Sequence, residues 1–484
     1  MENPRLWWTH DLADSNLYTV KVETFGDELL RTRLDVWEFK WGLRWFEMHD
    51  WLPYLNGHRL FLKGNNYPPG DTRIASMTRE RYLHDFTLAR DAHMNFMRIH
   101  AHIEKPELYD VADELGILLW QDFPLQWSYA REVLPQAERQ VPYMVRGLYN
   151  HPSVAIWCMH NEPIHITDTK ETGLIPILKG IWTSFGYSWD REVMDTRLKQ
   201  IVQQWDPTRP VLRCSGKWPV PWRPDTDSHF YFGWYSPPEG PKRRFETLAR
   251  LYPRTLQFVT EFGAQSFPNR ASACKFMDSD IGKVDWNHLV ERHHFQPNIM
   301  SVWYDWRKAK DLDDLIAMSQ DYQIEINQYY IDRLRLYKYK PCGGFAAFMF
   351  HDSNPAVQWS LIDYWREPKQ SYAHMQVALN PEYVFTLLAK DDYRVGETIH
   401  APLYVVNDSL WDYPDVRVHA ELLDVHDHSL WQSETMSATL EPDCSPKLVE
   451  TVSFGAAQAG DHRLVLTMQY GDQALENHYR VRVR

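Results

Sequence analysis

The chain has 484 residues, of which 44% are hydrophobic and 24% charged, and its 65 acidic and 52 basic residues give a net charge of −13. This balance is typical of a folded globular protein and excludes a largely disordered chain. The acidic excess disfavours nucleic acid as a partner, because binding to phosphates requires clusters of Lys and Arg.

The N-terminal residues, MENPRLWWTHD, lack the basic start and the apolar stretch of a secretory signal. No run in the sequence approaches the roughly 20 apolar residues that a membrane-spanning helix needs. These observations predict a cytoplasmic protein with no membrane partner, unless a segment upstream directs it elsewhere.

Residues 1–56 contain strand-like runs, LYTVKVET and LLRTRLDVWEFKWGLRWFEM, in which polar and apolar residues alternate. A complete immunoglobulin-like sandwich needs about seven strands and roughly 100 residues. We therefore predict a partial immunoglobulin-like β-sandwich over residues 1–56. Its remaining strands would come from residues upstream or from another chain.

Residues 57–380 alternate between short apolar strands and helical stretches, the pattern of parallel βα units. Eight strands with intervening helices predict a (β/α)8 TIM barrel. We place the strands at 59–66, 95–102, 116–123, 154–161, 210–216, 228–235, 256–263 and 343–352. A helix is expected over 191–205, and extra helices over 264–342.

Residues 381–484 return to a strand-and-turn pattern of the size of one immunoglobulin-like domain. The expected fold class is therefore α/β: a TIM barrel flanked by an N-terminal partial and a C-terminal immunoglobulin-like β-sandwich. The five cysteines are scattered and form no CxxC pair, which favours reduced thiols over disulfides or a zinc site.

In such a barrel, the residues that act on a substrate project from the carboxyl ends of the strands. The polar residues expected there are Asn65, Asn66, Arg98, His100, His102, Asp122, Asn161, Glu162, Tyr231, Glu261, His351 and Asp352. Glu162 and Glu261 end the apolar runs of the fourth and seventh strands, which lie across the barrel mouth from each other. A carboxylate pair can cleave a glycosidic bond, one as nucleophile and the other as acid and then base.

Other interpretations of these residues exist. Either glutamate could form a structural ion pair with an Arg, although two of them at facing strand ends favour catalysis. His100 and His102 share a strand face and could bind a metal. No third ligand has convincing spacing, so we predict neither a metal nor another cofactor.

Several segments resemble glycoside hydrolase family 2, and its β-mannosidase-like branch in particular. HPSVAIWCMHNEP (151–163) is similar to the family's acid/base segment, and VTEFGAQSFP (259–268) to its nucleophile segment. LNGHRLFLKGNNYPPGD (55–71) and MRIH (97–100) resemble its first two barrel strands. The resemblance implies a retaining exo-β-glycosidase that acts on terminal β-linked sugars, with β-mannosides as the expected substrates.

The resemblance also implies roles for individual residues. Glu162 would be the acid/base and Glu261 the nucleophile of a double displacement. Arg98 would hydrogen-bond the nucleophile and keep its pKa low, and Tyr231 would contact it as well. Asn161 would hold the 2-hydroxyl of the sugar.

Two further segments resemble the mannosidase branch, LLWQDFPLQW (118–127) and VQWSLIDYWREPKQSY (357–372). Alternation along the sixth strand places His229, Tyr231 and Tyr235 on one face. The predicted substrate-binding residues are Asn161, Arg98, His100, Asp122, Trp127, His229, Tyr231, Tyr235 and Asp352. Alternatively, Asp122 caps a loop and the Trp side chains pack at the barrel end.

Two departures from the family pattern bear on the substrate and the partners. Residues 348–352 read Phe-Met-Phe-His-Asp where the branch usually has Trp-Gln-Leu-Asn-Asp, so the sugar could instead be a glucosaminide, a galactoside or a uronide. The family also carries a jelly-roll domain ahead of the sandwich. Besides a glycoside substrate, the expected partners are therefore a second chain that supplies that domain, or a further copy in a homo-oligomer. The alternative from another class is a non-catalytic carbohydrate-binding subunit of a split enzyme.

Overall fold

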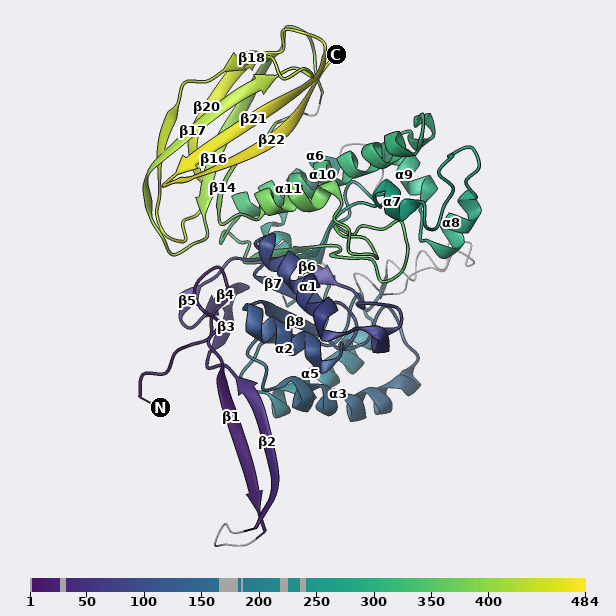
Figure 1. The fold of residues 1–484 in the computed structure, drawn as a ribbon, viewed down its shortest axis with the longest axis vertical. Coiled ribbons are helices and arrows are strands. Elements are labelled where there is room, and N and C mark those ends of the chain that lie inside the picture. Colours follow the sequence, from purple (N-terminus) through teal and green to yellow (C-terminus); the bar gives the residue numbers. More distant parts are fainter. Residues whose placement is uncertain are drawn as a thin grey trace.

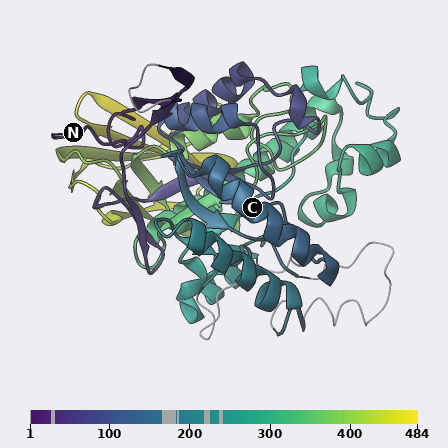
Figure 2. The same cartoon turned by 90° about the horizontal axis from the view of Figure 1, so that it is seen from below.

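The computed structural model describes residues 2–26, 32–164, 182–183, 186–217, 225–235, 241–390 and 392–484, without the side chains of 241–243. N-terminal strands, a barrel and a C-terminal β-sandwich follow one another along the chain (Figure 1). Figure 2, the view from below, shows helices of the barrel in the foreground and the yellow and green sandwich strands on the left.

The predicted eight-stranded barrel is confirmed. Its strands are β6 (Leu62–Tyr67), β7 (Phe96–Ile99), β8 (Leu118–Asp122), β9 (Val154–Cys158), β10 (Val211–Leu212), β11 (Ser228–His229), β12 (Val259–Glu261) and β13 (Gly344–Ala347). They form one parallel sheet in the order β10-β9-β8-β7-β6-β13-β12-β11. All eight strands are shorter than the sequence predicts, because the residues beyond the sheet continue as loops.

Helices follow most of these strands. The barrel helices are α1 (Arg79–Asp91), α2 (Pro106–Leu115), α3 (Leu134–Leu148), α5 (Thr196–Trp205) and α6 (Pro241–Leu251). The extra helices expected between the seventh and eighth strands are α7 (Arg270–Ala273), α8 (Trp286–Arg292), α9 (Pro297–Trp303) and α10 (Leu312–Leu336), and α11 (Gln370–Ala378) follows the eighth strand. None of the described helices has the length and apolarity to cross a lipid bilayer.

A small apolar core fills the barrel and continues into the N-terminal segment. Inward-facing side chains such as Phe96, Trp120 and Phe258 are at most 1% exposed, and they share one cluster with Trp7. Trp7 is fully buried and its indole Nε1 donates to the Asp113 carbonyl at 2.8 Å. The N-terminal segment therefore packs on the amino end of the barrel and leaves the carboxyl ends of the strands to the site.

The strands expected to form a partial sandwich make two small sheets. One contains β3 (Phe46–His49), β4 (Leu52–Leu55) and β5 (His58–Arg59), so it reaches past residue 56. The other is a hairpin of β1 (Tyr18–Phe25) and β2 (Arg33–Trp41) that projects from the molecule (Figure 1).

The hairpin is amphipathic, because residues paired across an antiparallel ladder lie on the same face. Its register pairs Tyr18 with Trp41, Val20 with Phe39 and Val22 with Trp37. One face is therefore entirely apolar at these positions, while Thr19, Lys21, Lys40 and Glu38 line the other. Trp37 is 57% exposed and Val22 45% exposed, so this apolar face is open to solvent.

Two stacked sheets form the C-terminal sandwich. The strands are β14 (Glu382–Thr386), β15 (Asp392–Tyr393), β16 (Thr398–Asn407), β17 (Tyr413–Leu423), β18 (Ser429–Gln432), β19 (Met436–Leu440), β20 (Lys447–Gly455), β21 (Gly460–Tyr470) and β22 (Gln473–Val483). One sheet has the order β14-β16-β20 and the other β15-β22-β21-β17-β18, with β19 also paired to β17. Buried and exposed residues alternate along β21 and β22, which is the pattern of a half-buried sheet.

A buried ion-pair network joins the sandwich to the barrel. Asp408 of the sandwich lies 2.6 Å from Lys63, 2.8 Å from Arg335 and 2.9 Å from Lys338, and all four side chains are at most 3% exposed. Burial opposes ionisation of Asp408, but the three cations outweigh it and hold its pKa well below the usual value. The network therefore fixes one orientation of the two domains.

Candidate active site

Polar side chains from five parts of the barrel meet at the carboxyl ends of its strands. Arg98 lies on β7, Asp122 ends β8, Glu162 follows β9, His229 ends β11 and Glu261 ends β12. Each strand is apolar up to this point, because its side chains pack either in the barrel interior or against the surrounding helices. The chain leaves the sheet at these residues, so their polar groups face one another.

Arg98 is the centre of this cluster and is fully buried. Its guanidinium donates to Glu261 Oε1 at 3.1 Å and to Asn161 Oδ1 at 2.6 Å. On its other side it pairs with Asp122, with Nη2 2.8 Å from Oδ2. Arg98 therefore neutralises the buried Asp122 carboxylate and also holds the Glu261 carboxylate in place.

Glu261 is 4% exposed and its two oxygens are held from several directions. Tyr231 donates its hydroxyl to Oε2 at 2.8 Å, and His100 Nε2 lies 3.2 Å from Oε1. Burial opposes ionisation, but His229, His100 and Arg98 outweigh it and hold the pKa of Glu261 far below the ordinary value. The Glu261 carboxylate is therefore ionised, as a nucleophile must be.

Glu162 lies at the rim, and its side chain is 20% exposed. One oxygen, Oε1, is 2.8 Å from His229 Nδ1, and the other, Oε2, accepts from the indole of Trp127 at 3.3 Å. The backbone of Glu162 has a φ of +49°, a conformation that non-glycine residues rarely adopt and that is concentrated at functional sites. The fold therefore accepts local strain to aim this carboxyl group at the centre.

His229 lies between the two glutamates. Its Nδ1 is 2.8 Å from Glu162 Oε1 and 3.4 Å from Glu261 Oε2. One side-chain nitrogen or oxygen from each of the three residues lies within 4.8 Å of those of the other two. Burial opposes the charged ring, but Glu261, Glu162 and Asp227 outweigh it and raise the pKa of His229.

Such a trio could also ligate a metal ion, as could Asp110, Asp113 and His151 on the outer layer. In the central trio, however, Arg98 and Tyr231 already hold the oxygens of Glu261. A buried cation against a carboxylate is what an anionic nucleophile needs. The set therefore fits covalent catalysis better than metal binding.

Tyr231 and Tyr235 lie in a turn and not in a strand, so strand alternation does not explain their positions. The sixth strand ends at His229, and residues 231–235 form a turn in which the Tyr235 N–H donates to the Tyr231 carbonyl at 3.0 Å. The prediction of three alternating residues in one strand is therefore wrong. The turn nevertheless brings the two rings together, with their centroids 5.3 Å apart.

An aromatic group continues from these tyrosines. The Trp359 ring lies 6.0 Å from Tyr235 and 5.9 Å from Phe348, and Phe348 lies 5.3 Å from the His100 ring. Trp359 is 8% exposed, whereas Tyr235 is 52% exposed. Apolar ring faces beside a carboxylate pair match the apolar face of a sugar ring.

Two predicted substrate-binding residues, Asp122 and Asp352, are fully buried. Asp122 is fully buried and accepts hydrogen bonds from Trp120 Nε1 at 3.0 Å and from the Ala101 N–H at 3.0 Å besides holding Arg98. Asp352 is also fully buried, and this burial, together with Asp363, raises its pKa to about 7. The eighth strand ends at Ala347, so the chain has turned beneath the surface before Asp352.

The remaining predicted residues lie together around Glu261. They are Arg98, His100, Asn161, Glu162, Trp127, His229, Tyr231 and Tyr235. Ser215, Asp227 and Asn66 belong to the same network but are not among the predicted substrate-binding residues. Asn66 was recognised as a strand-end residue, whereas Ser215 and Asp227 meet only when β10 and β11 come together in space.

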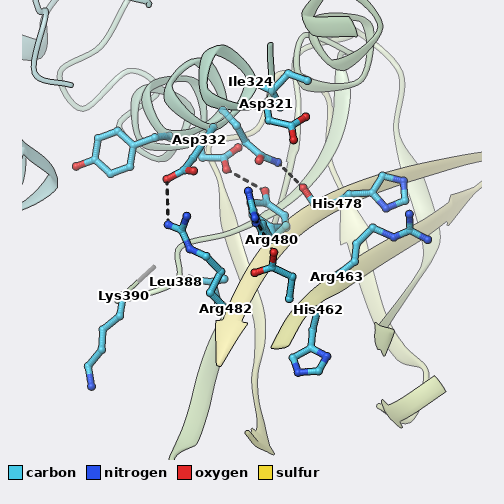
Figure 3. Close-up of a pocket in the computed structure, with 15 residues that line it drawn as sticks. Asp321, Ile324, Asp332, Leu388, Lys390, His462, Arg463, His478, Arg480 and Arg482 are labelled. Atoms are coloured by element: carbon cyan, nitrogen blue, oxygen red, sulfur yellow. Dashed lines mark hydrogen bonds and ion pairs between the residues drawn. The ribbon is translucent and has the colours of Figure 1, made fainter. Parts of the chain in front are cut away.

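A separate cavity of about 350 Å³ lies between α10 and the C-terminal sheet. Figure 3 shows Asp321 and Asp332 on its α10 side and Arg480 and Arg482 on β22. Arg480 pairs with Asp461 at 2.6 Å and Arg482 with Asp392 at 3.1 Å. The cavity is therefore a cleft between domains whose charges are already matched, and it lies apart from the glutamate pair.

Replacing Arg98 by Met is expected to destabilise the fold by about 3–5 kcal/mol, because Asp122 and Glu261 would stay buried without their cation. Urea unfolding followed by circular dichroism measures this loss. The matched control is Arg197→Met, which removes a guanidinium that is 54% exposed and pairs with Glu138 at 2.8 Å. Equal, small losses for both variants would contradict the central position of Arg98.

Comparison with known proteins places these features in a family. Residues 46–257 match the model of the TIM barrel domain of glycosyl hydrolases family 2. Beta-mannosidase B of Neosartorya fischeri is 25% identical over 413 residues, which cover 79% of this chain and 47% of that protein. The chain thus spans about half the length of the curated relatives that it matches.

Solved structures share the fold. The β-D-mannosidase of Dictyoglomus thermophilum matches 99% of this chain and 58% of its own, with a TM-score of 0.77 at 20% identity. An exo-chitosanase of Amycolatopsis orientalis matches 100% of this chain and 56% of its own, with a TM-score of 0.75 at 15% identity. Residues 46–257 therefore match a barrel domain of glycoside hydrolase family 2, and the chain is β-mannosidase-like.

Proposed function

We propose that this chain carries the catalytic barrel of a retaining exo-β-glycosidase that hydrolyses β-mannosides. The observation that carries the mechanism is the spacing of the glutamates, since an oxygen of Glu162 and an oxygen of Glu261 lie within 4.8 Å of each other. Retaining enzymes hold their two carboxyl groups about 5–5.5 Å apart, whereas inverting enzymes need about 6.5–9.5 Å to admit a water molecule. The short spacing therefore favours retention.

The reaction would proceed by two displacements. Glu261, ionised and held by Arg98 and Tyr231, attacks the anomeric carbon while the bond to the leaving oxygen breaks. Glu162 gives its proton to that oxygen. Water then attacks the glycosyl ester, Glu162 takes a proton from it, and Glu261 leaves as a carboxylate.

The surroundings of the glutamates suit a single sugar ring. Asn161 uses its amide oxygen to accept from Arg98, so its NH₂ group remains to donate to a sugar hydroxyl. Trp127 is 45% exposed at the rim and already contacts Glu162, where a leaving group would pass. The rings of Tyr235 and Phe348 offer apolar surface on the opposite side.

β-Mannosides are proposed as the substrates because the curated relatives at 24–25% identity carry the name beta-mannosidase B. A panel of nitrophenyl β-glycosides tests this choice directly. The mannoside should be hydrolysed with the highest kcat/KM. A preference for the glucosaminide, galactoside or glucuronide would refute the mannoside and leave the mechanism standing, whereas sugar binding without any turnover would indicate a carbohydrate-binding subunit.

The open face of the hairpin supports the proposal of a partner. A two-stranded sheet is marginal by itself, and an apolar sheet face is normally covered by a second sheet about 10 Å away. The relatives are about 1.7 times as long as this chain, so strands equivalent to their unmatched part are the proposed cover.

If this face is open in the chain alone, an apolar fluorescent dye will bind there. The variant Trp37→Glu should then reduce dye binding several-fold without lowering Tm, because Trp37 stacks only on the neighbouring Phe39 among the described rings. Val36→Glu, on the opposite polar face, is the matched control and should leave dye binding unchanged. Equal dye binding by wild type and Trp37→Glu would show that the face is already covered.

A further inference from the structure

A chain of hydrogen bonds runs from the interior of the barrel to Glu162. Asp227 Oδ2 accepts from the Ser215 hydroxyl at 2.8 Å, and Ser215 Oγ lies 3.2 Å from His229 Nε2. The other ring nitrogen of His229, Nδ1, lies 2.8 Å from Glu162 Oε1. Asp227 and Ser215 are fully buried, and their side chains are linked to the Glu162 carboxyl group through His229. The Ser215 backbone carbonyl separately accepts from the Glu162 N–H at 3.0 Å, a contact that a change of the Ser215 side chain leaves in place.

The hydrogen-bonding groups around Asp227 and Ser215 determine which atom donates in each hydrogen bond. Asp227 is surrounded by donors, since the Gly216 N–H donates to Oδ1 at 3.1 Å and Thr260 donates its hydroxyl to Oδ2. Ser215 has one proton and gives it to Asp227, so its oxygen is left to accept from His229. The Ser215 oxygen at 3.2 Å thus favours a proton on His229 Nε2 over the more distant Arg98 Nη1 at 3.4 Å. The other ring nitrogen, Nδ1, faces Glu162 Oε1, and one proton can be shared between them.

Packing holds the imidazole in this orientation. A methyl group on Gly216 would lie 2.4 Å from atoms of the His229 ring, so only a glycine leaves room for the ring. The φ of +81° at Gly216 is also one that glycine adopts readily. The ring is thus fixed by a backbone contact on one side and by the hydrogen bond to Ser215 at its edge.

We infer that Asp227 and Ser215 are positioning residues that orient His229, so that His229 and Glu162 share the proton that leaves with the aglycone and returns from water. The inference rests on the proposed glycosidase function. During the reaction Glu162 loses this proton to the leaving oxygen as the glycosidic bond breaks, and regains one from water as the ester is hydrolysed. Asp227, Ser215 and His229 form no covalent bond with the substrate. Together they carry the same number of protons before and after one catalytic cycle.

The charged groups that face His229 set the sign of the pH effect. They are Glu162, Glu261 and Asp227, together with the Arg98 guanidinium, whose Nη1 lies 3.4 Å from Nε2. The carboxylates favour the protonated ring, and so does an acceptor for Nε2–H. Removing Ser215 or the charge of Asp227 should therefore release the shared proton at a lower pH.

The kinetic test compares Ser215→Ala and Asp227→Asn with wild type on two mannosides. A phenyl leaving group needs a proton, so kcat/KM should fall about tenfold or more, while a 2,4-dinitrophenyl leaving group needs none and should lose less than about twofold. The alkaline limb of the pH profile should move to lower pH. Equal losses on both substrates with an unmoved limb would overturn the inference and leave only a structural role.

Ser153→Ala is the matched control for folding, because Ser153 is equally buried but precedes β9 at the opposite end of the barrel. This control should keep both activities and the pH profile.

A second measurement needs no substrate and so separates this inference from the proposed function. The titration of His229 is followed by NMR of protein labelled with ¹⁵N-histidine, with His229→Asn as the assignment control. Ser215→Ala should lower the His229 midpoint and weaken the Nε2–H tautomer signal. An unchanged midpoint and tautomer would overturn the inference even in an active enzyme, whereas inactivity of wild type with the predicted shift would count against the glycosidase function alone.

Discussion

The variant Glu261→Gln is expected to lose on the order of 10⁴-fold or more of the activity on aryl β-mannosides, because the nucleophile of a covalent mechanism has no substitute. The amide has the shape of the carboxyl group but cannot attack the anomeric carbon. Arg98 and Tyr231 donate to different oxygens of Glu261, at 3.1 and 2.8 Å, so the single amide oxygen keeps one of these hydrogen bonds and the NH₂ group cannot accept the other. The measurement is steady-state hydrolysis with the fold checked by circular dichroism.

Glu261→Asp is the matched control for this result. It keeps the negative charge beside Arg98 but withdraws the oxygen by roughly one methylene, so activity should fall while covalent chemistry remains possible. If Glu261→Gln kept a tenth of wild-type activity, Glu261 would not be the nucleophile, and the assignment of the seventh-strand glutamate would be wrong.

The second large effect is expected for Glu162→Ala. Loss of the acid should lower kcat/KM for a phenyl mannoside by roughly 10²–10⁴-fold, in the range of general acid catalysis. A 2,4-dinitrophenyl mannoside leaves without a proton and should still form the glycosyl ester. Because the base for water is missing as well, the ester should accumulate and give a burst followed by slow turnover.

Added azide provides the decisive control for Glu162→Ala. This small anion needs no base and fits the space that the carboxyl group vacates at the rim, so it should accelerate turnover of the dinitrophenyl mannoside and yield the β-mannosyl azide. Lack of rescue, or formation of the α-azide, would contradict the role of Glu162. The same azide concentration should leave wild type and Glu261→Gln unaffected.

Patterns with short-range causes could be predicted from the sequence. Apolar runs separated by helices predict eight parallel strands, because a barrel strand must be buried on both sides. Glu162 and Glu261 stand out because a charged residue directly after such a run can only face the strand end. The extra helices expected over residues 264–342 include α10 (Leu312–Leu336).

Other features depend on contacts that no local pattern reports. Strand alternation cannot describe Tyr231 and Tyr235, because a turn replaces the strand after His229. The sequence places Asp122 at a strand end and predicts a substrate-binding carboxylate, yet Asp122 is buried against Arg98. Ser215 and Asp227 lie 12 residues apart in the chain and meet only across β10 and β11. Tertiary packing alone determines these positions.

The most direct measurement of the central claim is covalent trapping with 2-deoxy-2-fluoro-β-mannosyl fluoride. Fluorine at carbon 2 slows both displacements, while the fluoride leaving group lets the first one proceed, so the glycosyl ester accumulates. Mass spectrometry should find one sugar per chain, on the peptide that contains Glu261, and no adduct in Glu261→Gln. An adduct on any other residue, or hydrolysis to the inverted anomer without an adduct, would contradict a retaining mechanism with Glu261 as its nucleophile.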